Sequence, residues 1–359
     1  MIKKMTMNDR SIMKKLIPQT CSVRFDRSCT GGITNKLTGS TPNIRVLLIE
    51  LSGGGQKSVV LKKTSGMIVL KGSILMSRGN MLLLAELVMS HKIFGYKGSY
   101  LRESCIYEHF AKEFRSIIPE YYGSLKRHLR HECYICIEKF SVNSFGGMKD
   151  YTELTERIAH IAAFYYLYPD KINGMMLNRY TAGDYKRGKH LLRKMYVKLD
   201  NTVFGELECV LDDFLGNLDI EFSINRGVKT ISHNDFSDRN IVNDGNIRIY
   251  DWELACVQNP EHDLVEFLVS VAHKLKNEEI AALVGHFCRT FYGSIYKDIC
   301  DEEFNDILIY NLLEYSVNKL TLLRTAALNM ELSFTKIYEK NVIRLYALLK
   351  ENEKNGQGT

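Results

Sequence analysis

The sequence predicts an α+β protein of two lobes, a small antiparallel-sheet lobe followed by a mainly helical lobe. Three observations indicate this arrangement: β-rich runs fill the first third, helical periodicity dominates after about residue 141, and one short β segment lies at residues 230–254. A chain of 359 residues is long enough for two lobes that share a cleft. We therefore assign residues 1–140 to the N-terminal lobe and residues 141–359 to the C-terminal lobe.

The N-terminal lobe contains alternating, β-branched runs that are typical of strands. These runs are residues 22–29, 44–51, 58–63 and 134–140. The segment Ser-Gly-Gly-Gly-Gln at residues 52–56 separates the second run from the third and predicts a hairpin turn, because glycine tolerates the dihedral angles that such turns need. Apolar spacing predicts helices at about residues 82–91 and 101–114.

The C-terminal lobe contains apolar residues at helical spacing. The helical stretches are residues 152–168, 207–218 and most of the chain from 264 to 350. Within the β segment, residues 240–253 predict two short strands joined by an Asp244-Gly245 turn. The sequence shows no internal repeat.

Composition indicates an ordinary folded protein: 45% hydrophobic and 25% charged residues, five prolines and no low-complexity tract. No run approaches the ~20 apolar residues of a membrane helix, and the basic N-terminus lacks the apolar core of a signal peptide. Nine unevenly spaced cysteines indicate reduced thiols. We expect a cytoplasmic protein that does not bind membranes.

A net charge of +6 is too small to predict a nucleic-acid-binding protein, although it suits a pocket for polyphosphate. Basic residues gather at positions 126–131 and again at 186–198. The second cluster lies on a helical pattern with the apolar face Leu192, Met195, Tyr196 and Leu199. A solvated helix face explains it better than an anion site.

A zinc site is suggested by His128, His131, Cys133 and Cys136. The two cysteines, however, belong to a run that alternates like a strand. An offset of three residues sends their side chains to opposite faces, so a shared metal is not expected.

The strongest chemical signal is the segment at residues 231–241, which contains His-x-Asp-x-x-x-x-Asn as His233, Asp235 and Asn240, followed by Asp251 at the end of a strand. Phosphoryl transfer needs a carboxylate that orients and accepts a proton from the attacking hydroxyl, and oxygen ligands that hold Mg²⁺ against the phosphates. Asp235 suits the first role. Asn240 and Asp251 suit the second.

This region resembles the catalytic segment of the aminoglycoside phosphotransferase and choline/ethanolamine kinase superfamily, whose fold is similar to that of protein kinases. The family has the same loop, then Asp-Trp/Tyr-Glu, which is Asp251-Trp252-Glu253 here, then an Asp-Leu pair, which is Asp263-Leu264. The resemblance implies a kinase-like fold with ATP and Mg²⁺ as cofactors. It also implies a structural role for His233, which packs and hydrogen-bonds the loop and is the second candidate catalytic residue. Asp263 is expected to brace that loop.

The resemblance extends into the N-terminal lobe. The segment at residues 31–37 is similar to the family's nucleotide loop, which implies that Gly31, Gly32, Thr34 and Asn35 contact the nucleotide. Val59-Val60-Leu61-Lys62 is similar to the strand that bears the phosphate-binding lysine.

The resemblance also bears on further positions of this lobe. Glu103 corresponds to the glutamate that holds this lysine. Lys63 is the competitor for the role of Lys62 and points to the other face of the strand. Glu138 and Phe140 fall at the interlobe hinge, where backbone groups would hold the adenine.

The sequence thus predicts transfer of the γ-phosphate of ATP to a small-molecule hydroxyl. The acceptor could be an aminoglycoside, another natural product, or an amino alcohol such as choline or ethanolamine. Because the aminoglycosides and amino alcohols are cationic, an acidic pocket is expected in the second lobe. The acidic residues available for it are Glu253, Glu261, Asp263 and Glu266.

Two alternatives remain open: a protein kinase and a non-catalytic nucleotide-binding module. Against the first, the sequence has no Asp-Phe-Gly or Ala-Pro-Glu segment. Against the second, every residue type that the chemistry needs is present. The acceptor, the choice between ATP and GTP, and the oligomeric state are not determined by the sequence.

Overall fold

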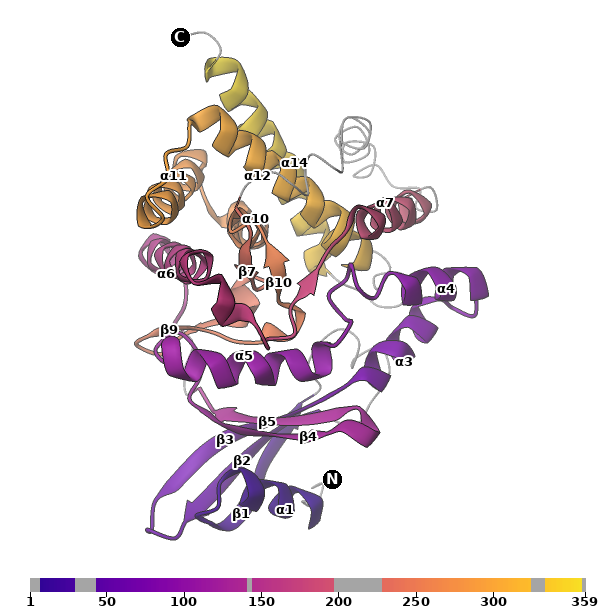
Figure 1. Ribbon diagram of the computed structural model, residues 1–359, viewed down its shortest axis with the longest axis vertical. Coiled ribbons are helices and arrows are strands. Elements are labelled where there is room, and N and C mark those ends of the chain that lie inside the picture. Colours follow the sequence, from indigo (N-terminus) through magenta and orange to yellow (C-terminus); the bar gives the residue numbers. More distant parts are fainter. Residues whose placement is uncertain (1–6, 30–42, 141–143, 197–227, 324–332, 357–359) are drawn as a thin grey trace.

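The computed structural model describes residues 7–29, 43–140, 144–196, 228–323 and 333–356. Figure 1 shows an antiparallel sheet at one end of the molecule and a helical lobe at the other, with helix α5 (Ser99–Glu113) between them. The predicted α+β fold with a sheet lobe and a helical lobe is confirmed.

The N-terminal sheet has five antiparallel strands in the order β1-β2-β3-β5-β4. Their bounds are β1 Thr20–Cys29, β2 Ile44–Leu51, β3 Gln56–Ser65, β4 Tyr121–Arg127 and β5 Glu132–Glu138. The predicted glycine turn joins β2 to β3, and Gly54 adopts a φ of +82° there, which is the conformation that favours glycine. A 3-10 turn, His128–Arg130, joins β4 to β5.

The two faces of this sheet are covered by different helices. Helix α1 (Met7–Leu16) packs on the face that includes Tyr134 and Cys136, whereas α5 packs on the face that includes Cys133 and Ile135. Strand alternation thus places Cys133 and Cys136 in separate cores, as predicted, and excludes the zinc site suggested by their spacing.

Two helices occupy the chain between β3 and α5. They are α3 (Gly66–Met76) and α4 (Met81–Met89). The Ser65 and Asn80 side chains cap them by accepting backbone N–H groups of Met67 and Leu83. The two helices pack together and project from the side of the molecule (Figure 1).

The second lobe is mainly helical. Its α-helices are α6 (Met148–Leu167), α7 (Ala182–Tyr196), α10 (Glu261–Val271), α11 (Asn277–Ser294), α12 (Asp301–Tyr315) and α14 (Ser333–Gly356). A π-helical segment, Ser316–Leu320, continues α12. Short 3-10 segments lie at Pro169–Ile172, Asp238–Asn240, Trp252–Leu254 and Ala272–Lys274.

Short strands place the candidate site at the base of this lobe. Strands β8 (Ile241–Asn243) and β9 (Ile247–Ile249) form the predicted hairpin, with Gly245 at a φ of +104°. A second small sheet has the order β6 (Asn178–Arg179), β10 (Cys256–Gln258) and β7 (Thr230–Ser232). The loop between β7 and β8 contains Asp235.

The sequence prediction missed several elements. Helices α1 and α3 and strands β4, β6 and β10 were not expected. Helix α3 contains an Ile-Val-Leu run and two glycines, which favour other structures locally. The predicted helix at residues 207–218 lies outside the described residues. Among the described residues, no helix is both long enough and apolar enough to cross a membrane.

Candidate active site

A buried lysine lies between the two lobes and contacts three carboxylates. Lys62 is on the central strand β3, and its Nζ is 2.7 Å from Glu103 Oε2 on α5 and 3.3 Å from Glu253 Oε2. It also donates a hydrogen bond to Asp251. The adjacent Lys63 points away and pairs with Glu132 at 2.5 Å. Strand alternation therefore brings Lys62, and not Lys63, to the face of the sheet that α5 covers.

The charges of this cluster show how strongly its members interact. Burial alone would lower the pKa of Lys62, but the charges of Asp251, Glu103 and Glu253 outweigh it and raise that pKa. Burial, together with the charges of Asp251 and Glu253, raises the pKa of Glu103 to about 7, although Lys62 opposes the shift. The cluster therefore has an excess of negative charge.

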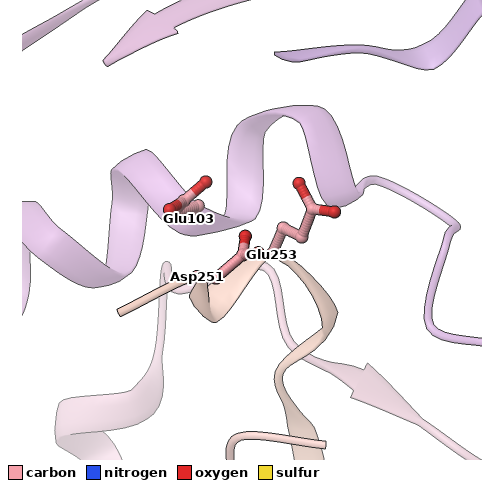
Figure 2. A group of neighbouring side chains, drawn as sticks. All are labelled: Glu103, Asp251 and Glu253. Atoms are coloured by element: carbon pink, nitrogen blue, oxygen red, sulfur yellow. The ribbon is translucent and has the colours of Figure 1, made fainter. Parts of the chain in front are cut away.

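Figure 2 shows the three carboxylates where helix α5 passes over the turn at residues 251–253. The ligand oxygens of Glu103, Asp251 and Glu253 all lie within 4.8 Å of one another. Oxygen ligands of this kind suit a hard divalent cation such as Mg²⁺, and the surplus negative charge would favour one. Asp251 thus belongs to a donor set that suits a magnesium ion, while Lys62 pairs with the same three carboxylates.

Asp251 is held in an uncommon backbone conformation. Its φ of 68° and ψ of 48° lie in the left-handed region, which few residues other than glycine adopt. Its backbone N–H donates to the Tyr107 hydroxyl of α5 at 3.2 Å. Such a conformation persists only where surrounding contacts enforce it, and it aims the Asp251 carboxylate at Lys62.

The loop that contains Asp235 is braced from helix α10. The Asp263 carboxylate accepts hydrogen bonds from the Ser232 hydroxyl at 2.6 Å, the His233 N–H at 2.9 Å and the Asn234 N–H at 3.2 Å. One turn later, Glu266 accepts the Phe236 N–H at 2.6 Å. The expectation that Asp263 braces the loop is confirmed by these contacts.

Asp235 is the one member of this loop whose carboxylate meets both an amide and an ammonium group. Asn240 Nδ2 donates to Asp235 Oδ2 at 3.1 Å and to the Asp235 carbonyl at 2.8 Å. Lys319 Nζ lies 3.3 Å from Asp235 Oδ1. Burial alone would raise the pKa of Asp235, but the charges of Lys319, Arg239 and His233 lower it to about 2.

His233 is fully buried. Its Nε2 donates to the Tyr250 carbonyl at 2.9 Å, and its ring packs 4.5 Å from the centroid of Trp252. These contacts join the loop to the strand that leads to Asp251. They agree with the packing role expected for His233, whereas its catalytic role stays a prediction.

The predicted hinge residues lie where β5 ends. The Glu138 side chain pairs with Arg248 of β9, and the Glu138 backbone N–H donates to the Glu120 carbonyl at 2.9 Å. The centroid of the Phe140 ring lies 5.7 Å from that of the Tyr250 ring. Both residues therefore contact the β9 end of the second lobe. The predicted nucleotide loop with Gly31, Gly32, Thr34 and Asn35 lies outside the described residues.

The four acids expected to form an acceptor pocket are used elsewhere. Glu253 contacts Lys62, and Asp263 and Glu266 bind the backbone of the Asp235 loop. Glu261 is fully buried and accepts the Tyr292 hydroxyl at 2.7 Å. These four acids thus have structural partners of their own, which explains why they lie close together in the sequence.

Two site residues escaped sequence reasoning. Lys319 lies in a helical stretch without a recognisable motif, more than 80 residues from Asp235 in sequence. Arg102 is fully buried beside Glu103 and donates to carbonyl groups of Gly95, Met176 and Glu253 at 2.6–2.9 Å. No local sequence pattern around Lys319 or Arg102 predicts these contacts, because tertiary packing alone brings the partners together.

The comparisons with known proteins agree with this geometry. Residues 170–295 match the model of the phosphotransferase enzyme family. The fold is similar to that of choline kinase LicA from Streptococcus pneumoniae, with 12% identity, a TM-score of 0.52 and coverage of 94% of this chain and 96% of that one. The predicted superfamily resemblance is confirmed. No curated protein sequence matches the chain.

Two further solved structures show the same phosphotransferase fold. The GDP complex of an aminoglycoside 2'-phosphotransferase-IIIa has 12% identity and a TM-score of 0.51, with 98% of this chain and 100% of that one covered. A choline kinase from Cryptosporidium parvum has 10% identity and a TM-score of 0.52, with coverage of 93% and 91%. These neighbours show the fold of the chain, and the family match over residues 170–295 is to phosphotransferase enzymes.

Proposed function

We propose that this protein transfers the γ-phosphate of ATP, with Mg²⁺, to a hydroxyl group of a small molecule. The observation that supports this most directly is the contact of Lys62 with both Glu103 and Asp251. It joins the sheet, the supporting helix and the residue after β9 into one cluster. We also propose that the nucleotide binds between lobes divided near residue 140.

In this proposal each residue has a defined task. Lys62, held by Glu103, binds the α- and β-phosphates of ATP. Asp251 and Asn240 would hold Mg²⁺, which would neutralise charge on the phosphates. Asp235 orients the acceptor hydroxyl. The hydroxyl oxygen bonds to the γ-phosphorus, the bond to the β,γ-bridging oxygen breaks, ADP leaves and the hydroxyl proton passes toward Asp235.

The low pKa of Asp235 agrees with such a mechanism. A carboxylate with a pKa of about 2 is a weak base, so its main contribution is to orient the nucleophile, and it accepts the proton late. Phosphoryl transfer has a loose transition state in most analyses and asks for positioning more than for early proton removal.

The test is transfer of labelled γ-phosphate from ATP with Mg²⁺. Amino alcohols, aminoglycosides, other hydroxylated natural products and a generic protein serve as acceptors. Asp235→Asn should lower kcat by at least ~100-fold, the lower scale for a positioned general base, with nucleotide affinity largely retained. Asp238→Asn is the matched control, because Asp238 lies in the same loop but its carboxylate pairs with Lys274.

The results of this assay distinguish a small-molecule kinase from a protein kinase and from a non-catalytic nucleotide-binding module. Transfer to one small-molecule class that is lost in Asp235→Asn supports the proposal. Transfer to the protein alone would instead favour a protein kinase. Binding of ATP without transfer to any acceptor, with Asp235→Asn indistinguishable from wild type, would favour a nucleotide-binding module.

A further inference from the structure

Lys319 brings an ammonium group to the predicted catalytic carboxylate from a distant part of the chain. Its side chain is only 8% exposed, and its Nζ is 3.3 Å from Asp235 Oδ1. The lysine belongs to the π-helical segment Ser316–Leu320. Segments of this kind are rare and occur frequently at functional sites, because the wider turn changes which side chains face inward.

The surroundings of Lys319 indicate that its position is specified. Its charge helps to lower the pKa of Glu266, which burial alone would raise, so the ammonium acts on two acids that contact the catalytic loop. Next to it, Asn318 is 2% exposed, and within the described part of the chain its amide atoms have no hydrogen-bond partner. A buried lysine costs free energy unless it is paired, so a surface role does not explain it.

Lys319 therefore places an ammonium group directly beside the Asp235 carboxylate and offsets the charge that would attract a cationic acceptor there. Arg239 adds a second positive charge near the Asp235 carboxylate. The nearby acids Asp263 and Glu266 accept backbone N–H groups of the loop, as described above. An acceptor whose hydroxyl contacts the Asp235 carboxylate would therefore also lie near the Lys319 ammonium group.

We propose that Lys319 is a positioning and specificity residue, which orients Asp235 and favours acceptors with a neutral or anionic group, not an ammonium group, next to the reacting hydroxyl. This inference rests on the proposed function. A neutral polyol or a hydroxy acid fits this charge arrangement, because two like charges within a few ångströms repel in a partly buried site.

The first test compares acceptors of equal size and different charge. Ethanolamine, ethylene glycol and glycolate offer a cationic, a neutral and an anionic neighbour to one hydroxyl, and larger amino, neutral and acidic polyols extend the series. The wild-type enzyme should have higher kcat/KM for the neutral or anionic member of each set. Lys319→Glu should shift the ratio of cationic to anionic acceptor by at least ~10-fold, a change of about 1.4 kcal/mol.

The control variant is Lys274→Glu. It makes the same charge change close to the same loop, on a lysine that pairs with Asp238, and should leave the ratio unchanged. A wild-type preference for cationic acceptors, or a ratio that Lys319→Glu does not move, would overturn the inference while the proposed function stands. Absence of transfer to every acceptor would instead count against the proposed function.

A second measurement tests the contact without turnover. Lys319→Met should lower the melting temperature more in the wild-type background than in the Asp235→Asn background, because only the former leaves a carboxylate without its ammonium partner. Equal decreases in both backgrounds would show that Lys319 does not interact with Asp235, and would overturn the inference even if no acceptor were found.

Discussion

The two charged centres of the site differ in their balance of positive and negative charge. Around Lys62, one ammonium group meets the carboxylates of Glu103, Asp251 and Glu253. Around Asp235, one carboxylate is close to Lys319 and also feels the charge of Arg239. The first centre has surplus negative charge, whereas at the second centre the charges of Lys319 and Arg239 offset those of Asp235 and the neighbouring Glu266.

This difference in charge explains how the two centres could act on different substrates: the first on the nucleotide with its metal ion, and the second on the hydroxyl acceptor. In the first centre, burial raises the pKa of Glu103 to about 7, the charges of Asp251 and Glu253 add to the shift, and a divalent cation would relieve the repulsion among these carboxylates. The second centre lowers the pKa of Asp235, so that this carboxylate remains ionised without a metal. Magnesium dependence should therefore reside mainly in Asp251 of the first centre, with Asn240, which contacts Asp235, as the second proposed ligand.

The largest effect is expected from a substitution that disrupts the first centre, around Lys62. Asp251→Ala should abolish the Mg²⁺-dependent part of nucleotide affinity, because it removes the carboxylate at the focus of the cluster. The measurement is nucleotide binding by calorimetry across a Mg²⁺ titration. Glu132→Ala is the control, since this acid pairs with Lys63 away from the cleft. A Mg²⁺ titration unchanged by Asp251→Ala would show that Asp251 is not a metal ligand.

The next effect concerns Asp263, whose carboxylate braces the loop that contains Asp235. Asp263→Asn should lower the free energy of unfolding by about 3 kcal/mol, because charge-assisted hydrogen bonds to three buried donors are weakened together. Urea unfolding measures it. We expect kcat to fall as well, since Asp235 follows the braced residues. Unaltered stability would mean that the loop holds its shape without Asp263.

A smaller effect compares two neighbouring lysines. Lys62→Met should weaken ATP binding by ~10–100-fold, the range for loss of a charged hydrogen bond. Lys63→Met makes the same change one residue later, on the opposite face of β3, and should leave affinity within about twofold, as expected of a residue away from the site. Equal losses in both variants would contradict the assignment of Lys62 to the cleft.

The sequence predicted those parts of the site that lie on short, regular segments. Strand alternation separated Lys62 from Lys63, and the hairpin around Gly245 fixed the spacing between Asn240 and Asp251. Contacts that depend on long-range packing were not predictable. Lys319 reaches Asp235 through a π-helical turn, and no local pattern distinguishes that turn from an α-helix.

The helices missed in the first lobe have a similar explanation. Helix α3 begins with Gly66 and contains Ile68, Val69 and Leu70, a run that favours a strand locally. Ser65 caps the helix, and packing against α4 supports it, so tertiary contacts decided its structure. Propensity alone is a weak guide for such a segment.

The last effect leaves catalysis unchanged and concerns only the stability of the second lobe, away from both centres. Burial raises the pKa of Glu261 to about 7, above its ordinary value of 4.5, although the hydrogen bond from Tyr292 opposes the shift. The folded state therefore binds this proton more tightly than the unfolded state. Stability from this group is fully present below pH 4.5 and is lost as the pH rises toward 7.

Glu261→Gln should remove that dependence. At pH 8 the variant should be more stable than wild type by roughly 3 kcal/mol, because a neutral amide replaces a buried charge, and the difference should vanish near pH 4. Urea unfolding across this pH range measures it, with Glu302→Gln on the exposed start of α12 as the control. Parallel stability curves for wild type and Glu261→Gln would show that Glu261 stays ionised in the fold, and would assign the buried negative charge of α10 to Asp263 and Glu266 alone.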